Sequence, residues 1–424
     1  MSAYLPRLQD AVLLDLLQGL PAVAIDGAKG VGKTSTAERV AGTVLQVDRP
    51  EVAESLRNDP GLIRRLKPPV LLDEWQYVPQ LWNSVRRSVD EDYRPGQFLL
   101  AGSASPRDED RLHSGAGRIV RLRMRPLSIE ERGLDEPSVR LADLLTGTAS
   151  EASRNTDVGF GRYLHEITAS GFPAIRQLPD RYRDAQLDSY VANVVEHDFP
   201  EQGLRVRRPQ TLFAWLKAYA AATAGTASYT TILDAATSGG SDKPTKVTTG
   251  AWRDMLSRLW LLDPVEAWLP GDNAFGRLSA APKHFLADPA LAARLLNITS
   301  ARLETGAVDH VIGPQGGTVA GRLFEALVAQ SLQVYASVNE ARLYHFRSEA
   351  GHREIDFIVE RGNIVVAVEV KLSPSVSDDD VRHLHWLGER VGPALAAKVV
   401  VNTGPTSYRR RDGVWVVPAA LLGA

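Results

Sequence analysis

The residues best suited to chemistry lie in a glycine-rich segment near the start of the chain. From Gly27 to Thr34 the sequence has the spacing G-x-x-x-x-G-K-T. Such a loop binds phosphates, because its backbone N–H groups face the ligand, its lysine reaches the β- and γ-oxygens and its threonine hydroxyl binds Mg²⁺. The segment therefore predicts a site for ATP and Mg²⁺. Its residues are Gly27, Ala28, Lys29, Gly30, Val31, Gly32, Lys33, Thr34 and Ser35.

Two acidic residues form a second candidate group. Asp73 and Glu74 directly follow the apolar run Val70-Leu71-Leu72. This is typical of a buried parallel strand that ends at the ligand-binding edge of its sheet. Asp73 is expected to hold the Mg²⁺ shell and Glu74 to polarise the attacking water. An acidic pair by itself is more often a solvated strand end, so the hypothesis depends on the glycine-rich loop.

Two further residues are weaker candidates for the same site. Ser103 follows the apolar run from Phe98 to Ala101 and is expected to contact the γ-phosphate or the water, although small polar residues end many strands. Arg118 lies in an arginine-rich segment and is a candidate for a charge-neutralising residue supplied to a neighbouring protomer. That role requires a homo-oligomer, whereas a solvated arginine is the commoner case.

A separate group lies in the C-terminal part and consists of Asp356, Glu369 and Lys371. The alternation of a strand places Glu369 and Lys371 on one face. Two carboxylates that share Mg²⁺ or Mn²⁺, with a lysine beside the attacking water, are suited to phosphodiester hydrolysis in DNA or RNA. Glu325, on a preceding amphipathic helix, can add a ligand. The alternative is a degenerate, non-catalytic fold that only binds a partner.

Each group requires particular elements to position it. Ala22 to Ile25 is typical of a short buried strand, and Ser35 to Val40 is typical of a helix. A strand before the loop and a helix after it favour a phosphate-binding loop over a glycine-rich turn that matches the pattern without binding a ligand. In the C-terminal part the pattern predicts the order helix, strand, strand, strand, helix, strand. These elements are expected at 318–336, 342–346, 354–359, 364–371, 380–390 and 397–402.

The middle of the chain is predicted to be helical, with apolar residues at helical spacing in 160–169, 184–198 and 210–224. Residues 229–268 allow two interpretations. One is a winged helix-turn-helix in which Lys243, Lys246 and Arg253 face DNA. The other, favoured because the charge is modest, is a lid packed on the ATPase. The core of that lid would be Trp252, Leu256, Leu259 and Trp260.

Composition limits the classes of function. The 424 residues include 49 Lys and Arg against 51 Asp and Glu, so a nucleic-acid partner must be met by a local patch. The absence of cysteine excludes thiol catalysis and fits a reducing compartment. The N-terminal residues lack the pattern of a signal peptide, and no apolar run is long enough to span a membrane. We expect a cytoplasmic protein.

These segments resemble a known family, the bacterial and archaeal AAA-like P-loop ATPases that carry a C-terminal PD-(D/E)XK nuclease-like domain. The resemblance is carried by Gly27 to Thr34, Asp73-Glu74-Trp75-Gln76, Ala101-Gly102-Ser103, His113 to Arg118, Asp356, Glu369 and Lys371. It implies an α/β fold of the additional-strand catalytic glutamate type with a central P-loop strand. It implies no settled substrate. Ile355 stands where the nuclease signature has proline, a departure often tolerated in that superfamily.

The sequence predicts three domains: a P-loop ATPase domain at 1–135, a helical lid and winged-helix region at 136–315, and a nuclease-like domain at 316–424. Two functions follow from this organisation. In the first, ATP hydrolysis drives a nucleic-acid-processing enzyme whose C-terminal domain cuts. In the second, the protein is an NTP-operated switch whose C-terminal domain only recognises a partner.

Overall fold

The computed structural model describes residues 4–102, 115–150, 153–237, 243–269, 280–306, 318–348 and 352–424. The chain forms two compact units, which we describe separately. The first unit comprises Met1–Arg125, Phe172–Ala174 and Met255–Leu261. The second unit comprises Pro126–Gly171, Ile175–Asp254 and Leu262–Ala424.

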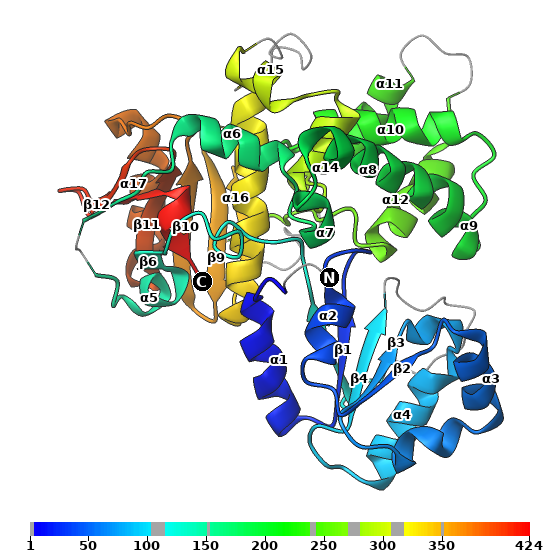
Figure 1. The fold of residues 1–424 in the computed structure, drawn as a ribbon. Helices are drawn as coiled ribbons and strands as arrows, with labels where there is room; N and C mark the ends of the chain where they lie inside the picture. Colours follow the sequence, from blue (N-terminus) through cyan, green and yellow to red (C-terminus); the bar gives the residue numbers. More distant parts are fainter. Residues whose placement is uncertain are drawn as a thin grey trace. The chain divides into compact units, whose positions relative to one another are not determined.

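A five-stranded parallel sheet forms the centre of the first unit, with strand order β2-β3-β4-β1-β5 (Figure 1). The strands are β1 (Ala22–Asp26), β2 (Thr43–Gln46), β3 (Val70–Asp73), β4 (Phe98–Gly102) and β5 (Ile119–Arg123). The predicted α/β class and parallel sheet are confirmed. β4 is an additional strand between β1, which leads into the glycine-rich loop, and β3, which carries the acidic pair. The middle strand is β4 rather than β1.

Helices cover this sheet. They are α1 (Leu8–Gly19), α2 (Lys33–Glu38), α3 (Pro50–Asn58) and α4 (Gln80–Glu91), with the 3₁₀ turns η1 (Pro60–Arg65) and η2 (Trp75–Tyr77). Proline at the first position of α3 fits a helix start, because its missing N–H has no partner there in any helix. The buried rings of Trp75 and Trp82 lie 5.0 Å apart between their centroids. This contact fixes the chain that follows the acidic pair.

The middle of the chain is helical, as predicted. Its elements are β6 (Val139–Arg140), α5 (Leu141–Thr146), β7 (Arg154–Asn155), α6 (Phe160–Thr168), α7 (Pro173–Arg176), α8 (Asp180–Asn193), the π turn η4 (Val194–Asp198), α9 (Phe199–Glu201), α10 (Pro209–Ala221), α11 (Tyr229–Ala236), α12 (Lys246–Arg258), α14 (Pro289–Leu295) and α15 (Ser300–Glu304). After α12 the chain is extended, and antiparallel bridges join Leu262 to Leu286 and Val265 to Lys283. Helices followed by such a pair are the order of elements expected for a winged helix.

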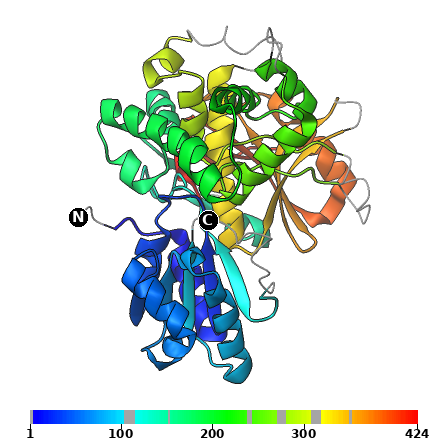
Figure 2. The same ribbon diagram turned by 90° about the vertical axis from the view of Figure 1, so that its right-hand side faces the viewer.

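The C-terminal part contains a seven-stranded mixed sheet of order β7-β12-β13-β11-β10-β9-β8. Its elements in chain order are α16 (Val319–Val338), β8 (Arg342–Arg347), β9 (Glu354–Arg361), β10 (Ile364–Val370), α17 (Asp378–Val391), the 3₁₀ turn η5 (Gly392–Ala394), β11 (Leu395–Asn402), β12 (Thr406–Arg409), β13 (Trp415–Pro418), the 3₁₀ turn η6 (Ala419–Leu421) and β14 (Leu422–Gly423). The predicted order of the first six helices and strands is confirmed. In Figures 1 and 2, α16 lies between the middle helices and this sheet, which explains why it is apolar on most sides.

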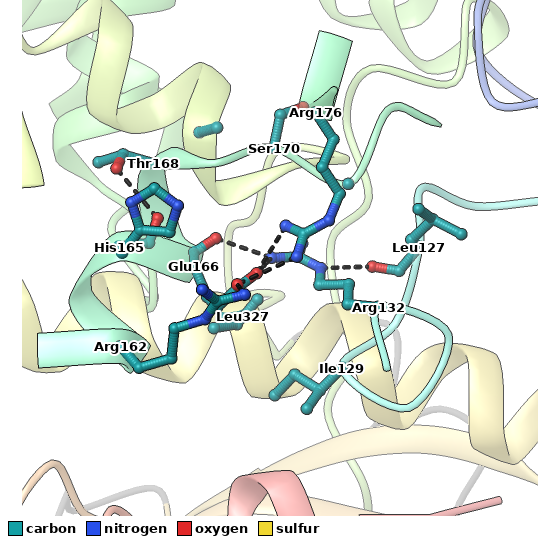
Figure 3. Close-up of polar contacts among 12 residues, drawn as sticks. Leu127, Ile129, Arg132, Arg162, His165, Glu166, Thr168, Ser170, Arg176 and Leu327 are labelled. Carbon is teal, nitrogen blue, oxygen red and sulfur yellow. Dashed lines mark hydrogen bonds and ion pairs between the residues drawn. The ribbon is translucent and has the colours of Figure 1, made fainter. Parts of the chain in front are cut away.

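A buried ion network connects three parts of the second unit (Figure 3). The carboxylate of Glu166 on α6, which is fully buried, binds Arg132, Arg162 and Arg176 at 3.1, 2.9 and 2.6 Å. Arg132 is also buried and donates to Gln330 on α16 at 3.1 Å. Removal of one member would leave the others charged and poorly solvated. Within the described residues, no helix is both long and apolar enough to cross a membrane.

Candidate functional site

The glycine-rich loop lies between β1 and α2, at the carboxyl edge of the first sheet. Gly32 precedes α2 with a φ of 103°, a conformation that residues with a side chain rarely adopt. At Gly27 a Cβ atom would lie 2.3 Å from the backbone oxygen of Met124. The two glycines therefore allow the tight backbone path that a phosphate-binding loop needs.

Lys33 is buried at the first position of α2 and is only 6% exposed. Its Nζ donates hydrogen bonds to the backbone oxygens of Gly27 and Ala28, at 2.8 and 2.9 Å. Burial lowers the pKa of Lys33 to about 8, although the carboxylates nearby, Glu74 foremost, act in the opposite direction. The ammonium thus spans the loop, where phosphate oxygens can replace the two carbonyls.

Thr34 and Asp73 meet across the same edge. Thr34 Oγ1 donates to Asp73 Oδ1 at 2.9 Å, and Asp73 is the last residue of β3. Burial raises the pKa of Asp73 to about 6. A hydroxyl and a carboxylate at this distance are the oxygen ligands that Mg²⁺ prefers, so the residues fit the ion. Thr34 and Asp73 would hold it.

Glu74 follows Asp73 in the left-handed conformation, with a φ of 53°. Its carboxylate accepts a hydrogen bond from Gln76 Nε2. A side chain at Gly102, the end of β4, would be crowded, because a Cβ would lie 2.9 Å from Nε1 of the buried Trp75 ring. Ser103, the next residue, lies outside the described residues. The structure therefore brings Lys33, Thr34, Asp73 and Glu74 together.

Arg118 lies at the opposite edge of the sheet. Ile119, the next residue, pairs with Ala22 at the start of β1, which is about 13 Å of strand from the loop. Arg118 Nε donates to Asp90 Oδ1 at 2.7 Å, and the side chain is 46% exposed. Arg118 therefore does not reach the site of its own chain, and its action on a neighbouring protomer stays a prediction.

Two residues near the loop were not predicted from the sequence. Arg7 is buried and donates to the backbone oxygens of Val31 and Arg125, at 2.7 and 2.6 Å. Asp26, at the end of β1, accepts from Arg121 at 2.9 Å. The sequence around Arg7 does not indicate that this arginine contacts the loop, because many helices are preceded by an arginine. Asp26 could have been predicted, because it is an aspartate at the end of an apolar strand, as Asp73 is.

The predicted C-terminal group lies on neighbouring strands. Asp356 Oδ2 on β9 accepts a hydrogen bond from the backbone N–H of Val370 on β10, at 2.9 Å. Lys371 Nζ donates to Glu369 Oε1 at 2.9 Å. Burial and the charge of Asp356 raise the pKa of Glu369 to about 8. The three side chains converge, as the predicted strand pair requires.

A further side chain, Lys283, enters this cluster and was not predicted. Its Nζ lies 2.5 Å from Glu325 Oε1 and 2.9 Å from Asp356 Oδ1. Burial lowers the pKa of Lys283, but the carboxylates around it, Asp356 foremost, outweigh burial and raise it. Within the described part of the chain, no group of three or more His, Cys, Asp or Glu residues is arranged to hold a metal ion. An ammonium therefore already lies between two of the carboxylates that the sequence predicts as metal ligands.

The cations expected to face DNA are largely engaged within the chain. Lys243 forms an ion pair with Asp234, and the guanidinium of Arg253 lies 4.6 Å from the ring centre of Tyr229. Lys246 is exposed at the start of α12. The predicted lid core is buried at Trp252, Leu256 and Leu259, and Trp260 is half-buried. Its ring lies 4.7 Å from the guanidinium of Arg123, also in the first unit.

Three parts of the chain match known domain families. Residues 20–133 match a family described as an AAA domain. Residues 162–302 and 320–422 match two families that are each described as a domain of unknown function. The matched AAA segment includes the glycine-rich loop, the acidic pair and all five strands of the first sheet.

Individual proteins are similar over most of the chain. Two curated relatives, the uncharacterized proteins Rv2008c of Mycobacterium tuberculosis and Mb2031c of Mycobacterium bovis, are each 25% identical over 413 residues, which is 95% of this chain and 81% of theirs. A Walker-type ATPase of Pyrococcus abyssi has a TM-score of 0.35 at 15% identity, covering 68% of this chain and 94% of that one. An ORC2 protein of Aeropyrum pernix has a TM-score of 0.31 at 15% identity, with coverages of 72% and 92%. The segment 20–133 thus matches an AAA domain family, and it carries a glycine-rich loop and a parallel sheet of the kind found in P-loop ATPases.

Proposed function

We propose that this protein is a Mg²⁺-dependent ATPase that works as a nucleotide-operated switch. The observation that carries the proposal is the convergence of Lys33, Thr34 and Asp73 at one edge of the sheet, with Thr34 Oγ1 and Asp73 Oδ1 2.9 Å apart. Phosphoryl transfer needs little covalent chemistry from the protein and depends on positioning and charge. These three residues supply both.

The residues of the site divide the work of hydrolysis. Lys33 would exchange its two carbonyl partners for β- and γ-phosphate oxygens, while Thr34 and Asp73 hold the ion. When bound, Mg²⁺ neutralises the charge that develops on the phosphates. Glu74 would orient the attacking water and accept its proton, and the hydrogen bond from Gln76 holds this carboxylate in place. Ser103 is proposed to contact the γ-phosphate or the water.

The substitution Glu74→Gln should separate binding from turnover. We expect kcat for ATP hydrolysis to fall by about 10²–10³-fold, because the amide cannot accept a proton, while the affinity for ATP stays within about twofold. Steady-state hydrolysis and titration with a fluorescent ATP analogue would measure the two quantities. Glu51→Gln, an exposed glutamate on α3, is the matched control. Equal turnover by Glu74→Gln and wild type would show that another residue positions the water.

Arg118 is proposed to complete the site of a second copy of the chain. Its exposure and its position away from its own loop are consistent with that role. Hydrolysis should then rise faster than linearly with protein concentration. A constant specific activity, unaltered by Arg118→Ala, would return this residue to a solvated role.

A metal-dependent nuclease acting on DNA or RNA is the second candidate for the C-terminal domain. The order α16-β8-β9-β10-α17-β11 favours it, because it brings Asp356, Glu369 and Lys371 together as a PD-(D/E)XK core requires. Cleavage of single- or double-stranded DNA or RNA with Mn²⁺ should then be lost in Asp356→Ala while ATP hydrolysis persists. If the wild type cuts none of these substrates with or without ATP, the nuclease is rejected and the nucleotide-operated switch is the remaining proposal.

A further inference from the structure

The lysine between the C-terminal carboxylates comes from outside the helix and strands of that core. Lys283 forms an antiparallel bridge with Val265 and lies more than thirty positions before α16 begins. Its side chain is 1% exposed. Besides Glu325 and Asp356, a third carboxylate, Glu354, lies 3.7 Å from its Nζ. The negative charge of these carboxylates is therefore already balanced, in part, by a buried cation of the chain itself.

Most carboxylate oxygens of the cluster already have a partner within the protein. Asp356 uses Oδ1 for Lys283 and Oδ2 for the N–H of Val370. Glu369 uses Oε1 for Lys371. Among the described residues, Glu369 Oε2 has no hydrogen-bond partner, and Glu325 Oε1 has the ion pair with Lys283 at 2.5 Å but no hydrogen bond. Mg²⁺ needs near-octahedral oxygen coordination and usually binds through one or two carboxylates, but here the ammonium of Lys283 already lies between Glu325 and Asp356.

The backbone holds Lys283 in this position. Its N–H donates to Val265 O at 2.8 Å, and its carbonyl accepts from Val265 N at 2.9 Å. The next residue, His284, is fixed in the same way: its N–H donates to Gly225 O, and its carbonyl accepts from Ala224 N, both at 2.9 Å. Withdrawal of the segment would break all these hydrogen bonds. The ammonium is thus built into the fold.

We propose that Lys283 is the permanent cation of this cluster, that it takes the place of a divalent ion, and that the C-terminal domain therefore neither binds such an ion there nor cuts phosphodiesters. An ammonium balances carboxylate charge, but it cannot coordinate a water and lower the pKa of that water as a metal ion does. The cluster instead fastens the segment around Lys283 to α16 and β9. This inference supports the switch over the nuclease and is independent of the ATPase site.

The test is Mn²⁺ binding to the full chain without nucleotide, followed by electron paramagnetic resonance and by thermal unfolding. We expect the wild type to show no Mn²⁺ site that Asp356→Asn removes. Lys283→Met should leave the carboxylates without a cation, lower Tm and create a Mn²⁺ site at least about 100-fold tighter than any at this position in the wild type. About 1 mM Mn²⁺ should then raise the Tm of Lys283→Met by mass action and by more than it raises that of the wild type, since Thr34 and Asp73 are the same in both proteins.

Two comparisons make the result decisive. Lys371→Met, which removes the other lysine but keeps Lys283, should gain no Mn²⁺ site. If Lys283→Met does not fold, the wild type against Asp356→Asn still decides. A wild-type Mn²⁺ site that Asp356→Asn abolishes would overturn the proposal, as would a folded Lys283→Met that neither loses stability nor gains a site.

Discussion

Replacing Lys33 by alanine should abolish measurable ATP binding. The buried ammonium is the cation that the loop presents to the β- and γ-phosphates, and no other lysine is part of the predicted contact with these oxygens. We expect an affinity loss of about 100-fold or more, equivalent to about 2.8 kcal/mol. Isothermal titration with ATP and Mg²⁺ would measure it.

The matched control is Lys67→Ala, since Lys67 is exposed. It should bind ATP as the wild type does. Circular dichroism should show that Lys33→Ala keeps its fold, because the hydrogen bonds of Lys33 within the described part of the chain go to two carbonyls of its own loop. Unchanged affinity in a folded Lys33→Ala protein would remove the assignment of the loop.

The second large effect is expected at Glu166, in the buried ion network. Glu166→Gln should lower the free energy of unfolding by about 3–5 kcal/mol, because the variant leaves buried Arg132 without its counter-charge. This is a large part of the stability of an ordinary domain. Urea unfolding at neutral pH, compared with Glu389→Gln on the exposed face of α17, would measure it. Equal stability of the two variants would contradict the expectation.

The pH dependence gives an independent check of the same network. Burial raises the pKa of Glu166, but the hydrogen bond from Arg176 and the charge of Arg132 outweigh burial and lower it from 4.5 to about 2. Because the pKa of the folded state is depressed, the stabilisation is complete above the unfolded value and is lost as the pH falls through the folded one. The stability difference between wild type and Glu166→Gln should therefore shrink by about 3 kcal/mol between about pH 4.5 and pH 2.

The nucleotide site could be predicted because its signals are local. Lys33 and Thr34 stand at fixed spacing in a loop, and Asp73 ends an apolar strand, so each residue carries its own context. The parallel strands then force these ends to meet. The C-terminal strands were predicted for the same reason, since alternation and a turn at Gly362 define the pair that holds Asp356. The predicted three-domain division stays a prediction.

What could not be predicted depends on distant pairing. Lys283 lies 73 positions from Asp356, in a segment without helical or strand periodicity of its own. Glu166 stands on an amphipathic helix, where a charged residue is usually solvated, and its partners come from α6, α7 and the segment before α5. The burial of these two side chains and the identity of their ion-pair partners cannot be predicted from the neighbouring residues, because both depend on how separate segments of the chain pack.

The first unit takes segments from three places along the chain, the last of which ends at Leu261. During synthesis all five strands emerge early and can pair while the ribosome is still translating. Trp260, which stacks against Arg123, follows roughly 140 residues later, a delay on the order of ten seconds at ordinary elongation rates. The first unit therefore remains incomplete on the ribosome while most of the helical middle is synthesised. A stop codon in that interval would release a first unit without its last segment, Met255–Leu261, and a pause would prolong the time that the sheet spends without it.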